Sequence, residues 1–318
     1  MDSGNQSSAV SATLPQVAQL ERVLNDWHQR LVSGEGHSAV EALCRVLLSL
    51  RLQSADDEWL EIKSFCLTHP IRELLHQDPY TRRAYEKPRG YAGDAVMLDY
   101  VYGSTPPEGA SPLGCRIFSG TTGLSNGLSV IARRDLLSQQ IDELAAKRQH
   151  PRIVSFACGH LREGQRAQAV RAGAIGALYA IDQDQESLDI VKREQGLYGV
   201  TTMHASVVSL IRGKLKLDNI DFAYAAGLYD YLSDGVAAKT TKVLFDMLAS
   251  EGRLLIANFM PESHGRGYMD AFMDWSLIYR TEEQLRQVMS LVPLSFVASH
   301  RLWRDQFGNI AYLEIVRG

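Results

Sequence analysis

The sequence lacks the features that would identify a membrane protein, a metal protein or a disulfide-rich secreted protein. No uninterrupted apolar stretch approaches the roughly 20 residues that a transmembrane helix requires. The only cysteines among the 318 residues are Cys44, Cys66, Cys115 and Cys158. They form no C-x-x-C pair, which argues against both a zinc site and a disulfide framework. The N-terminal stretch has no lysine or arginine before Arg22 and no apolar core of a signal peptide. We therefore expect a cytoplasmic protein with reduced thiols, no bound metal and no membrane insertion.

The chain also lacks an excess of positive charge. Its formal net charge is −4 at pH 7, so it carries no electrostatic footprint for a nucleic-acid backbone or an anionic membrane. A small-molecule ligand is the better expectation. The 45% hydrophobic content and the length predict a sizeable core in one large or two modest domains. The sequence allows a homodimer but does not require one.

Two regions differ in their apolar periodicity. We expect residues 1–14 to form a disordered tail and residues 15–125 to form a helical domain that covers the substrate. Apolar positions recur there at helical spacing, as in Leu20, Leu24, Trp27 and Leu31. Within this domain, the segment 78–112 is rich in Gly, Pro and Tyr, which indicates a structured loop with a short helix over 94–102.

The region 126–318 is predicted to be a Rossmann-like α/β domain. A long helix over 126–147 is followed by short β-branched runs that alternate with amphipathic segments, which is typical of a parallel sheet flanked by helices. The runs are RIVSFA, ALYAID, VTTMHA, IDFAYAAG and RLLIANF. The last two runs, LSFVASHRLW and IAYLEIVRG, are separated by turn residues and predict a terminal hairpin, which places an antiparallel strand in an otherwise parallel sheet.

The first run ends in the loop ACGHLREG, residues 157–164, which opens a helix. A glycine-rich turn lets a ligand approach the backbone, and a helix N-terminus offers unpaired N–H groups. Matched against G-x-G-x-x-G, only the middle position, Gly159, is glycine, because Ala157 and Arg162 occupy the other two. A pyrophosphate site is therefore poorly supported, and a cofactor without phosphates is favoured.

The second run ends in Asp182, 23 positions after Gly159. A carboxylate at this place can accept two hydrogen bonds from a ribose diol, although an aspartate after a strand is also a favoured helix N-cap. His160 is interpreted as a loop donor rather than a metal ligand, because no second histidine or carboxylate lies at ligand spacing. Cys158 is interpreted as a small space-filling residue.

At these residues the sequence resembles class I S-adenosylmethionine-dependent methyltransferases. More narrowly, KPRGYAGDAVMLDYVYG, ACGHLREG and MDWSLIYRTEEQL resemble bacterial methyltransferases of extracellular factor 3-hydroxypalmitic acid methyl ester biosynthesis, over roughly residue 70 to the C-terminus. The resemblance implies S-adenosylmethionine as cofactor and a small-molecule acceptor. The acceptor group would be the carboxylate of a hydroxy-fatty acid or of an amino-acid-like metabolite. Two alternatives stay open: a non-catalytic cofactor or nucleotide sensor, and an NAD-dependent oxidoreductase, which the degenerate glycine motif disfavours.

The resemblance also implies residue roles. The cofactor-binding residues would be Ala157, Cys158, Gly159, His160, Asp182, Gln183, Ala205, Ser206, Gly227 and Leu228. The catalytic candidates near the transferred methyl group are Tyr91, Asp94 and Tyr229.

Further residues are expected to contact the acceptor. They are Arg89, Tyr100, Arg134, Trp275, Tyr279 and Arg280. Arg89 and Arg134 could pair with a substrate or cofactor carboxylate through bidentate hydrogen bonds, whereas a structural ion pair is the alternative for Arg134. A packing role for the tyrosines and an N-cap role for Asp94 are equally open.

Overall fold

The computed structural model describes residues 14–318, with side chains from residue 19 onward, and divides into two compact units. The first unit contains the residues up to 93 together with 104–124 and 264–276. The second contains residues 94–103, 125–263 and 277–318. The predicted boundary lay at residue 125. The division differs from it in two places, because 94–103 belongs to the second unit and 264–276 belongs to the first. The tail expected at 1–14 lies outside the described residues except for its last residue, Leu14, at which the first helix begins.

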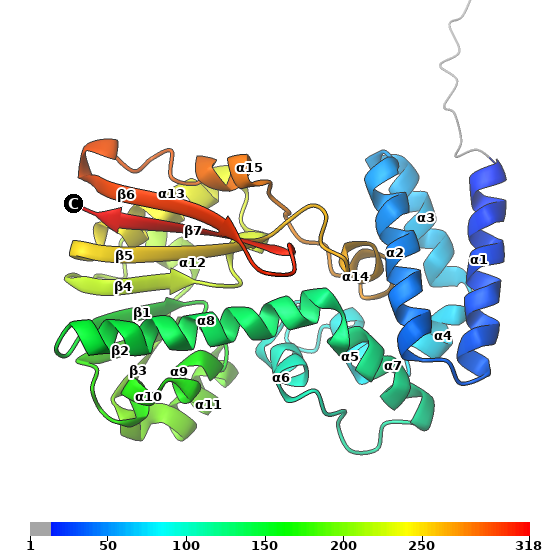
Figure 1. The fold of residues 1–318 in the computed structure, drawn as a ribbon, viewed down its shortest axis with the longest axis horizontal. Coiled ribbons are helices and arrows are strands. Elements are labelled where there is room, and N and C mark those ends of the chain that lie inside the picture. Colours follow the sequence, from blue (N-terminus) through cyan, green and yellow to red (C-terminus); the bar gives the residue numbers. More distant parts are fainter. Residues whose placement is uncertain (1–13) are drawn as a thin grey trace, which may run out of the picture. The chain divides into compact units, whose positions relative to one another are not determined.

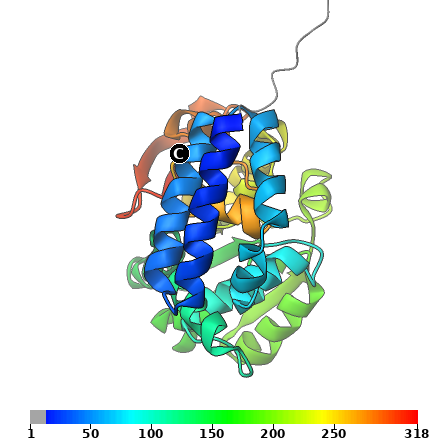
Figure 2. The same ribbon diagram turned by 90° about the vertical axis from the view of Figure 1, so that its right-hand side faces the viewer.

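The first unit is helical, as expected. Its helices are α1 (Leu14–Val32), α2 (His37–Gln53), α3 (Asp56–Thr68), α4 (Ile71–Leu75), α5 (Pro79–Glu86), α7 (Pro112–Gly123) and α14 (Arg266–Phe272). Figure 2 shows α1 in front of this group, with its axis roughly aligned with that of α2. Leu20, Leu24, Trp27 and Leu31 are all buried. The apolar stripe predicted for α1 therefore faces the core of the unit.

The segment 264–276 joins the first unit through close packing and buried hydrogen bonds. A Cβ atom at Gly267 of α14 would lie only 2.4 Å from the carbonyl carbon of Leu47 in α2, so only glycine permits this approach. The indole Nε1 of Trp59 donates a hydrogen bond of 3.0 Å to Asp270 Oδ2. These contacts are non-local, which is why the sequence periodicity did not predict them.

The second unit contains a seven-stranded sheet. Its strands are β1 (Arg152–Phe156), β2 (Ala177–Asp182), β3 (Val200–His204), β4 (Ile220–Ala225), β5 (Leu248–Phe259), β6 (Val297–Arg304) and β7 (Ile310–Arg317). The strand order is β3-β2-β1-β4-β5-β7-β6. The first five strands pair in parallel, and β7 pairs antiparallel with both β5 and β6. The predicted Rossmann-like, mostly parallel sheet with an antiparallel terminal hairpin is therefore confirmed.

The second unit also contains helices, some of which cover the two faces of this sheet. They are α6 (Ala95–Gly103), α8 (Ser125–Lys147), α9 (Arg162–Arg166), α10 (Gln168–Arg171), α11 (Gln185–Gln195), α12 (Val207–Ile211), α13 (Asp234–Asp246) and α15 (Glu282–Gln287). Three short 3-10 turns, η1 (Gly196–Tyr198), η2 (Tyr229–Tyr231) and η3 (Leu294–Phe296), complete the unit. In Figure 1, α8 crosses in front of the strands and α13 lies behind them. The long helix predicted over 126–147 is present as α8.

The strand order creates a switch point between β1 and β4. From β1 the chain proceeds outward to β2 and β3, whereas β4 and β5 lie on the opposite side of β1. Loops that leave the carboxyl ends of β1 and β4 therefore diverge, and open α/β sheets bind their ligands in the crevice formed at such a point. Buried side chains fill the interior of the sheet on both sides of this point, among them Phe156, Ile181 and Ala225.

Candidate functional site

The loop after β1 alternates between left-handed and other backbone conformations. Ala157, Gly159 and Leu161 have φ angles of +56°, +52° and +50°. These three positions are spaced two residues apart, so the loop has the geometry of a G-x-G-x-G turn with alanine and leucine at its outer positions. A Cβ atom at Gly159 would lie 3.2 Å from Ala95 Cβ of α6, so this helix packs closely against the loop. Cys158 is 8% exposed, and burial raises the pKa of its thiol, which fits the predicted space-filling role.

Asp182 lies at the carboxyl end of β2, beside this loop. Its Oδ2 accepts a hydrogen bond of 2.8 Å from the backbone N–H of Gly159, and its Oδ1 accepts one of 2.9 Å from the N–H of Asp184. The side chain is 8% exposed, and burial raises the pKa of the carboxyl above its usual range. The structure thus brings together the two residues on which the sequence prediction mainly depended.

The loop after β3 lies next to Asp182 as well. The backbone N–H of Ala205 donates to the carbonyl of Asp182 at 2.9 Å. Ser206 is the N-cap of α12, where its hydroxyl accepts a hydrogen bond from the N–H of Ser209. Gln183 is exposed, and its carbonyl is 2.9 Å from His204 Nε2. The predicted ribose and adenine residues therefore form one contiguous edge of the second unit.

His160 belongs to a charged cluster rather than to a metal site. Its Nδ1 is 2.8 Å from Asp99 Oδ2, and Arg162 binds both oxygens of the same carboxylate at 2.7 Å. Burial alone would raise the pKa of Asp99, but the hydrogen bonds from Arg162 and His160 lower it to about 2. Within the described part of the chain, no three potential metal ligands lie together. The interaction of His160 with Asp99 links the loop to α6. Sequence patterns could not predict it, because 61 residues separate the two.

Gly227 and Leu228 follow β4 and are partly exposed at the carboxyl edge, where they were predicted. Tyr229, the next residue, does not have its predicted position near the transferred methyl group. Its side chain is completely buried, and its hydroxyl lies 2.8 Å from Thr241 Oγ1 of α13. Burial raises the pKa of this hydroxyl far above its usual range. The structure therefore gives Tyr229 a packing role in place of the predicted catalytic role.

Arg280 also differs from its predicted role in substrate binding. The side chain is only 1% exposed. Its guanidinium donates to the carbonyls of Tyr229 and Leu232 at 2.7 and 2.5 Å and to Asn258 Oδ1 at 2.8 Å. It also pairs with Asp234 at 2.8 Å. Because these acceptors all belong to the second unit itself, Arg280 is a structural residue that ties the loop after β4 to β5.

On α8 two adjacent arginines have different environments. Arg134 pairs with Asp135 at 2.8 Å, and its guanidinium lies over the ring of Tyr102, 4.7 Å from the centroid. This is the structural ion pair that the sequence left open as the alternative for Arg134. The neighbouring Arg133 is 4% exposed and donates from Nη1 to the carbonyl of Ala226 at 2.6 Å. Arg133 was not among the predicted site residues, although it also falls on the apolar stripe of this helix.

The remaining predicted residues lie in both units. Arg89, Tyr91 and Trp275 belong to the first unit, and Asp94, Tyr100 and Tyr279 belong to the second. Asp94 is completely buried, and its Oδ1 accepts a hydrogen bond of 3.0 Å from the N–H of Met97 at the start of α6. It therefore has the N-cap role that the sequence left open. Trp275 is buried, whereas the other four side chains are partly exposed.

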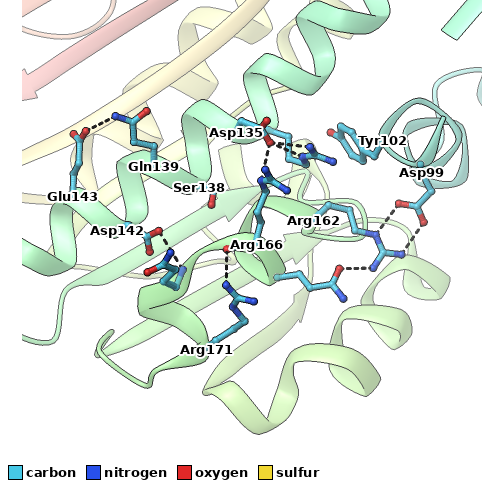
Figure 3. Close-up of a pocket in the computed structure, with 14 residues that line it drawn as sticks. Asp99, Tyr102, Asp135, Ser138, Gln139, Asp142, Glu143, Arg162, Arg166 and Arg171 are labelled. Atoms are coloured by element: carbon cyan, nitrogen blue, oxygen red, sulfur yellow. Dashed lines mark hydrogen bonds and ion pairs between the residues drawn. The ribbon is translucent and has the colours of Figure 1, made fainter. Parts of the chain in front are cut away.

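A cavity of about 990 Å³ lies beside α8 (Figure 3). Its lining residues come from α6, α8, α9 and α10, and none belongs to a strand. Two ion pairs lie there: Arg166 with Asp135 at 3.0 Å, and Arg162 with Asp99 (Figure 3). Asp142 accepts a hydrogen bond of 2.7 Å from the N–H of Ala169. None of the predicted cofactor-binding residues lines this hollow.

Comparisons with known proteins support the fold of this chain but identify no family. No family model and no curated protein matches the sequence. A possible exported protein from Bordetella parapertussis has a similar structure over 98% of this chain and 99% of its own, with 14% identity and a TM-score of 0.57. Two further structures, each containing S-adenosylhomocysteine, are similar over part of the chain. Magnesium protoporphyrin IX methyltransferase from Synechocystis is 14% identical with a TM-score of 0.44, covering 60% of this chain and 85% of its own. An N-methyltransferase from Bradyrhizobium japonicum is 10% identical with a TM-score of 0.42, covering 58% and 86%.

The first of these similarities supports the fold of the whole chain, and at these identities none establishes an activity. Among residues 14–318, no helix is both long enough and apolar enough to cross a membrane. All four cysteines are free.

Proposed function

We propose that the second unit binds S-adenosylmethionine and transfers its methyl group to a small-molecule acceptor. The observation that carries this proposal is the position of Asp182, whose carboxylate lies at the end of β2 and accepts the N–H of Gly159 in the loop after β1. In a sheet of this order, that edge borders the switch point, where open α/β sheets bind ligands. The left-handed turn at Ala157, Gly159 and Leu161 brings main-chain atoms to the same edge.

The residues at this edge fit the chemical groups of the cofactor. Each oxygen of Asp182 accepts one backbone hydrogen bond, and a carboxylate oxygen can accept a second, so both oxygens can also receive a ribose hydroxyl. Main-chain atoms of Ala157–His160 would contact the methionine part. Ala205 and Ser206, whose loop hydrogen-bonds to β2, would border the adenine, with Gln183 beside the ribose. Gly227 and Leu228 would line the path of the methyl group.

The sulfonium supplies an activated methyl group, so the protein contributes mainly orientation of the acceptor and exclusion of water. By the family resemblance, we propose a carboxylic acid as acceptor, either a hydroxy-fatty acid or an amino-acid-like metabolite. A carboxylate acceptor needs no general base. Where the acceptor atom is a hydroxyl or an amine, Asp94 or Tyr91 is proposed to take its proton. Arg89, Tyr100, Trp275 and Tyr279 are proposed acceptor contacts.

Calorimetric titration with S-adenosylhomocysteine tests the cofactor assignment directly. We expect the wild-type protein to bind it and Asp182→Ala to bind on the order of a hundredfold more weakly, because two charge-assisted hydrogen bonds to the ribose are lost. Asp184→Ala is the matched control. Asp184 lies in the same loop, and its carboxylate caps α11 by accepting the N–H of Glu186. Its removal leaves the proposed ribose contact intact.

Three results would contradict the assignment. Equal weakening in the two variants would show that loop structure, and not a ribose contact, determines affinity. Binding of NAD with no binding of S-adenosylhomocysteine would favour an oxidoreductase. Binding of S-adenosylhomocysteine without methylation of any acceptor, in a metabolite extract supplied with methyl-labelled cofactor, would favour a sensor.

A further inference from the structure

Arg133 is a buried guanidinium without a counter-ion. It is 4% exposed, and its one hydrogen bond among the described residues runs from Nη1 to the carbonyl of Ala226. No carboxylate of the described chain lies within 4 Å of it. Arg280, which is equally buried, makes hydrogen bonds to four residues, including an ion pair with Asp234. The contrast shows that most of the donors of Arg133 are not used within the second unit.

Two buried acids, Glu163 and Asp230, feel this charge, since Arg133 acts to lower the pKa of each, but neither forms an ion pair with it. Glu163 accepts a hydrogen bond of 2.9 Å from the hydroxyl of Tyr224, and Asp230 accepts one of 2.7 Å from the N–H of Phe259. Burial raises the pKa of both carboxyls, that of Asp230 to about 6. Removing a charge from water without a partner is costly, so buried charges in proteins normally have a partner or receive one from a ligand.

The position of Arg133 identifies where such a ligand would lie. The carbonyl of Ala226 that it binds follows directly after β4. Its Nη2 lies 3.8 Å from the place that a Cβ atom would occupy at Gly227. Helix α8, which carries it, leads directly into β1. The guanidinium therefore borders the switch point between β1 and β4, on the side of β1 opposite to Asp182.

We propose that Arg133 binds the carboxylate at the amino-acid end of the cofactor, an inference that rests on the proposed function. With the ribose at the end of β2 and the adenine beside β3, a cofactor that extends along the sheet edge places its amino-acid end over β1 and β4. A guanidinium with free donors is suited to a carboxylate, which it can bind through two parallel hydrogen bonds. Arg134, one residue further along α8, is already paired with Asp135 and does not serve this role.

The test compares two ligands that differ only in this carboxylate: S-adenosylhomocysteine and its decarboxylated analogue. Their affinity ratio is measured by calorimetry for the wild type, Arg133→Met, Arg133→Lys and the matched control Arg134→Met. Loss of a charge-assisted interaction is expected to reduce the ratio by about tenfold to a hundredfold in Arg133→Met, and by less in Arg133→Lys, which keeps the charge. Arg134→Met is expected to retain the wild-type ratio. Because both ligands are titrated into the same sample, a loss of folded protein does not change the ratio.

The possible outcomes separate this inference from the proposed function. An unchanged ratio in Arg133→Met overturns the inference, whether both affinities fall equally or neither falls. An unchanged ratio together with a raised KM for a methyl acceptor would assign Arg133 to the acceptor instead. A reduced ratio in Arg134→Met but not in Arg133→Met would overturn the inference and assign the carboxylate contact to Arg134. Failure of the wild type to bind either ligand would reject the proposed function itself.

Discussion

At the scale of single residues, the loop after β1 shows how a backbone conformation can be present without its usual amino acids. Ala157 and Leu161 adopt left-handed φ angles that glycine adopts more readily, and only Gly159 between them is glycine. Leu161 is 1% exposed, so packing offsets the conformational cost at that position. Ala157 is only partly buried and has a small side chain, so it has less packing to offset the same cost.

Ala157→Gly is therefore expected to stabilise the protein. A left-handed alanine costs about 1 kcal/mol or more, and glycine removes this cost while increasing the entropy of the unfolded chain. We expect a net gain of about 0.5–1 kcal/mol, measured as a rise of about 2 °C in the melting temperature. Ala174→Gly is the control, since this exposed alanine is not left-handed, and there the entropy effect alone should lower stability. A melting temperature below that of the wild type in Ala157→Gly would contradict this account.

At the scale of secondary-structure elements, the sequence predicted the strands and the long helix well but not the orientation of individual side chains. The predicted runs correspond to all seven strands. The β-branched runs are clearest where both faces are buried, as in β1 and β4, whereas β6 is mostly exposed. On α8, Arg133 and Arg134 lie three and four residues after Val130, and both spacings fall on the same face of a helix. Periodicity therefore could not decide which arginine faces the sheet edge. The structure buries Arg133 and pairs Arg134 with Asp135.

Helix α6 carries the element-scale prediction, since Asp94 is both its N-cap and a proposed proton acceptor. Asparagine caps helices about as well as aspartate but cannot accept a proton at neutral pH. We expect Asp94→Asn to keep the wild-type melting temperature and, with a hydroxyl or amine acceptor, to lower turnover on the order of a hundredfold or more. Asp94→Ala is the reference, because it removes both the carboxylate and the cap. Loss of the cap is expected to lower the stability by about 1 kcal/mol.

Normal turnover of a hydroxyl or amine acceptor in Asp94→Asn, together with a lowered melting temperature in Asp94→Ala, would restrict Asp94 to capping. Tyr91→Phe is measured in parallel as the second candidate. Turnover close to normal in both conservative variants would remove these two residues from the proposed chemistry.

At the scale of the whole molecule, the sequence predicted two regions but not how the chain divides between them. The segments 94–103 and 264–276 belong to the units opposite to those expected. In the second segment, Gly267 packs against Leu47 and Asp270 accepts the indole N–H of Trp59, contacts between residues more than 200 positions apart. Local periodicity contains no information about such pairs, because it reports only which face of a helix is apolar. The candidate site at the strand ends was easier to predict, since parallel strands place their carboxyl ends at one edge.

Each unit contains a buried aspartate whose pKa is raised to about 6, which leads to a prediction for stability against pH. Burial raises the pKa of Asp78 in the first unit and of Asp230 in the second, each to about 6. A folded-state pKa above that of the unfolded chain means that the native state binds the proton more tightly. The contribution of each carboxyl to stability is therefore fully present below about pH 4 and is lost as the pH rises through about 6. Asp99 acts in a different window, since its pKa is lowered to about 2: its contribution to stability is fully present above about pH 4 and is lost as the pH falls towards 2.

Asparagine resembles the protonated carboxyl and does not titrate, so Asp78→Asn and Asp230→Asn isolate these contributions from those of all other groups. We compare the free energy of unfolding of each variant with that of the wild type. From pH 4 to pH 7.5 this difference is expected to shift by about 1–3 kcal/mol in favour of the variant, whatever its value at pH 4. Calorimetric melting at pH 4, 5, 6 and 7.5 measures this difference. Because the two aspartates lie in different units, each substitution should move the transition of its own unit if calorimetry resolves two. A difference from the wild type that stays constant across the range would show that the carboxyl does not titrate there in the folded protein.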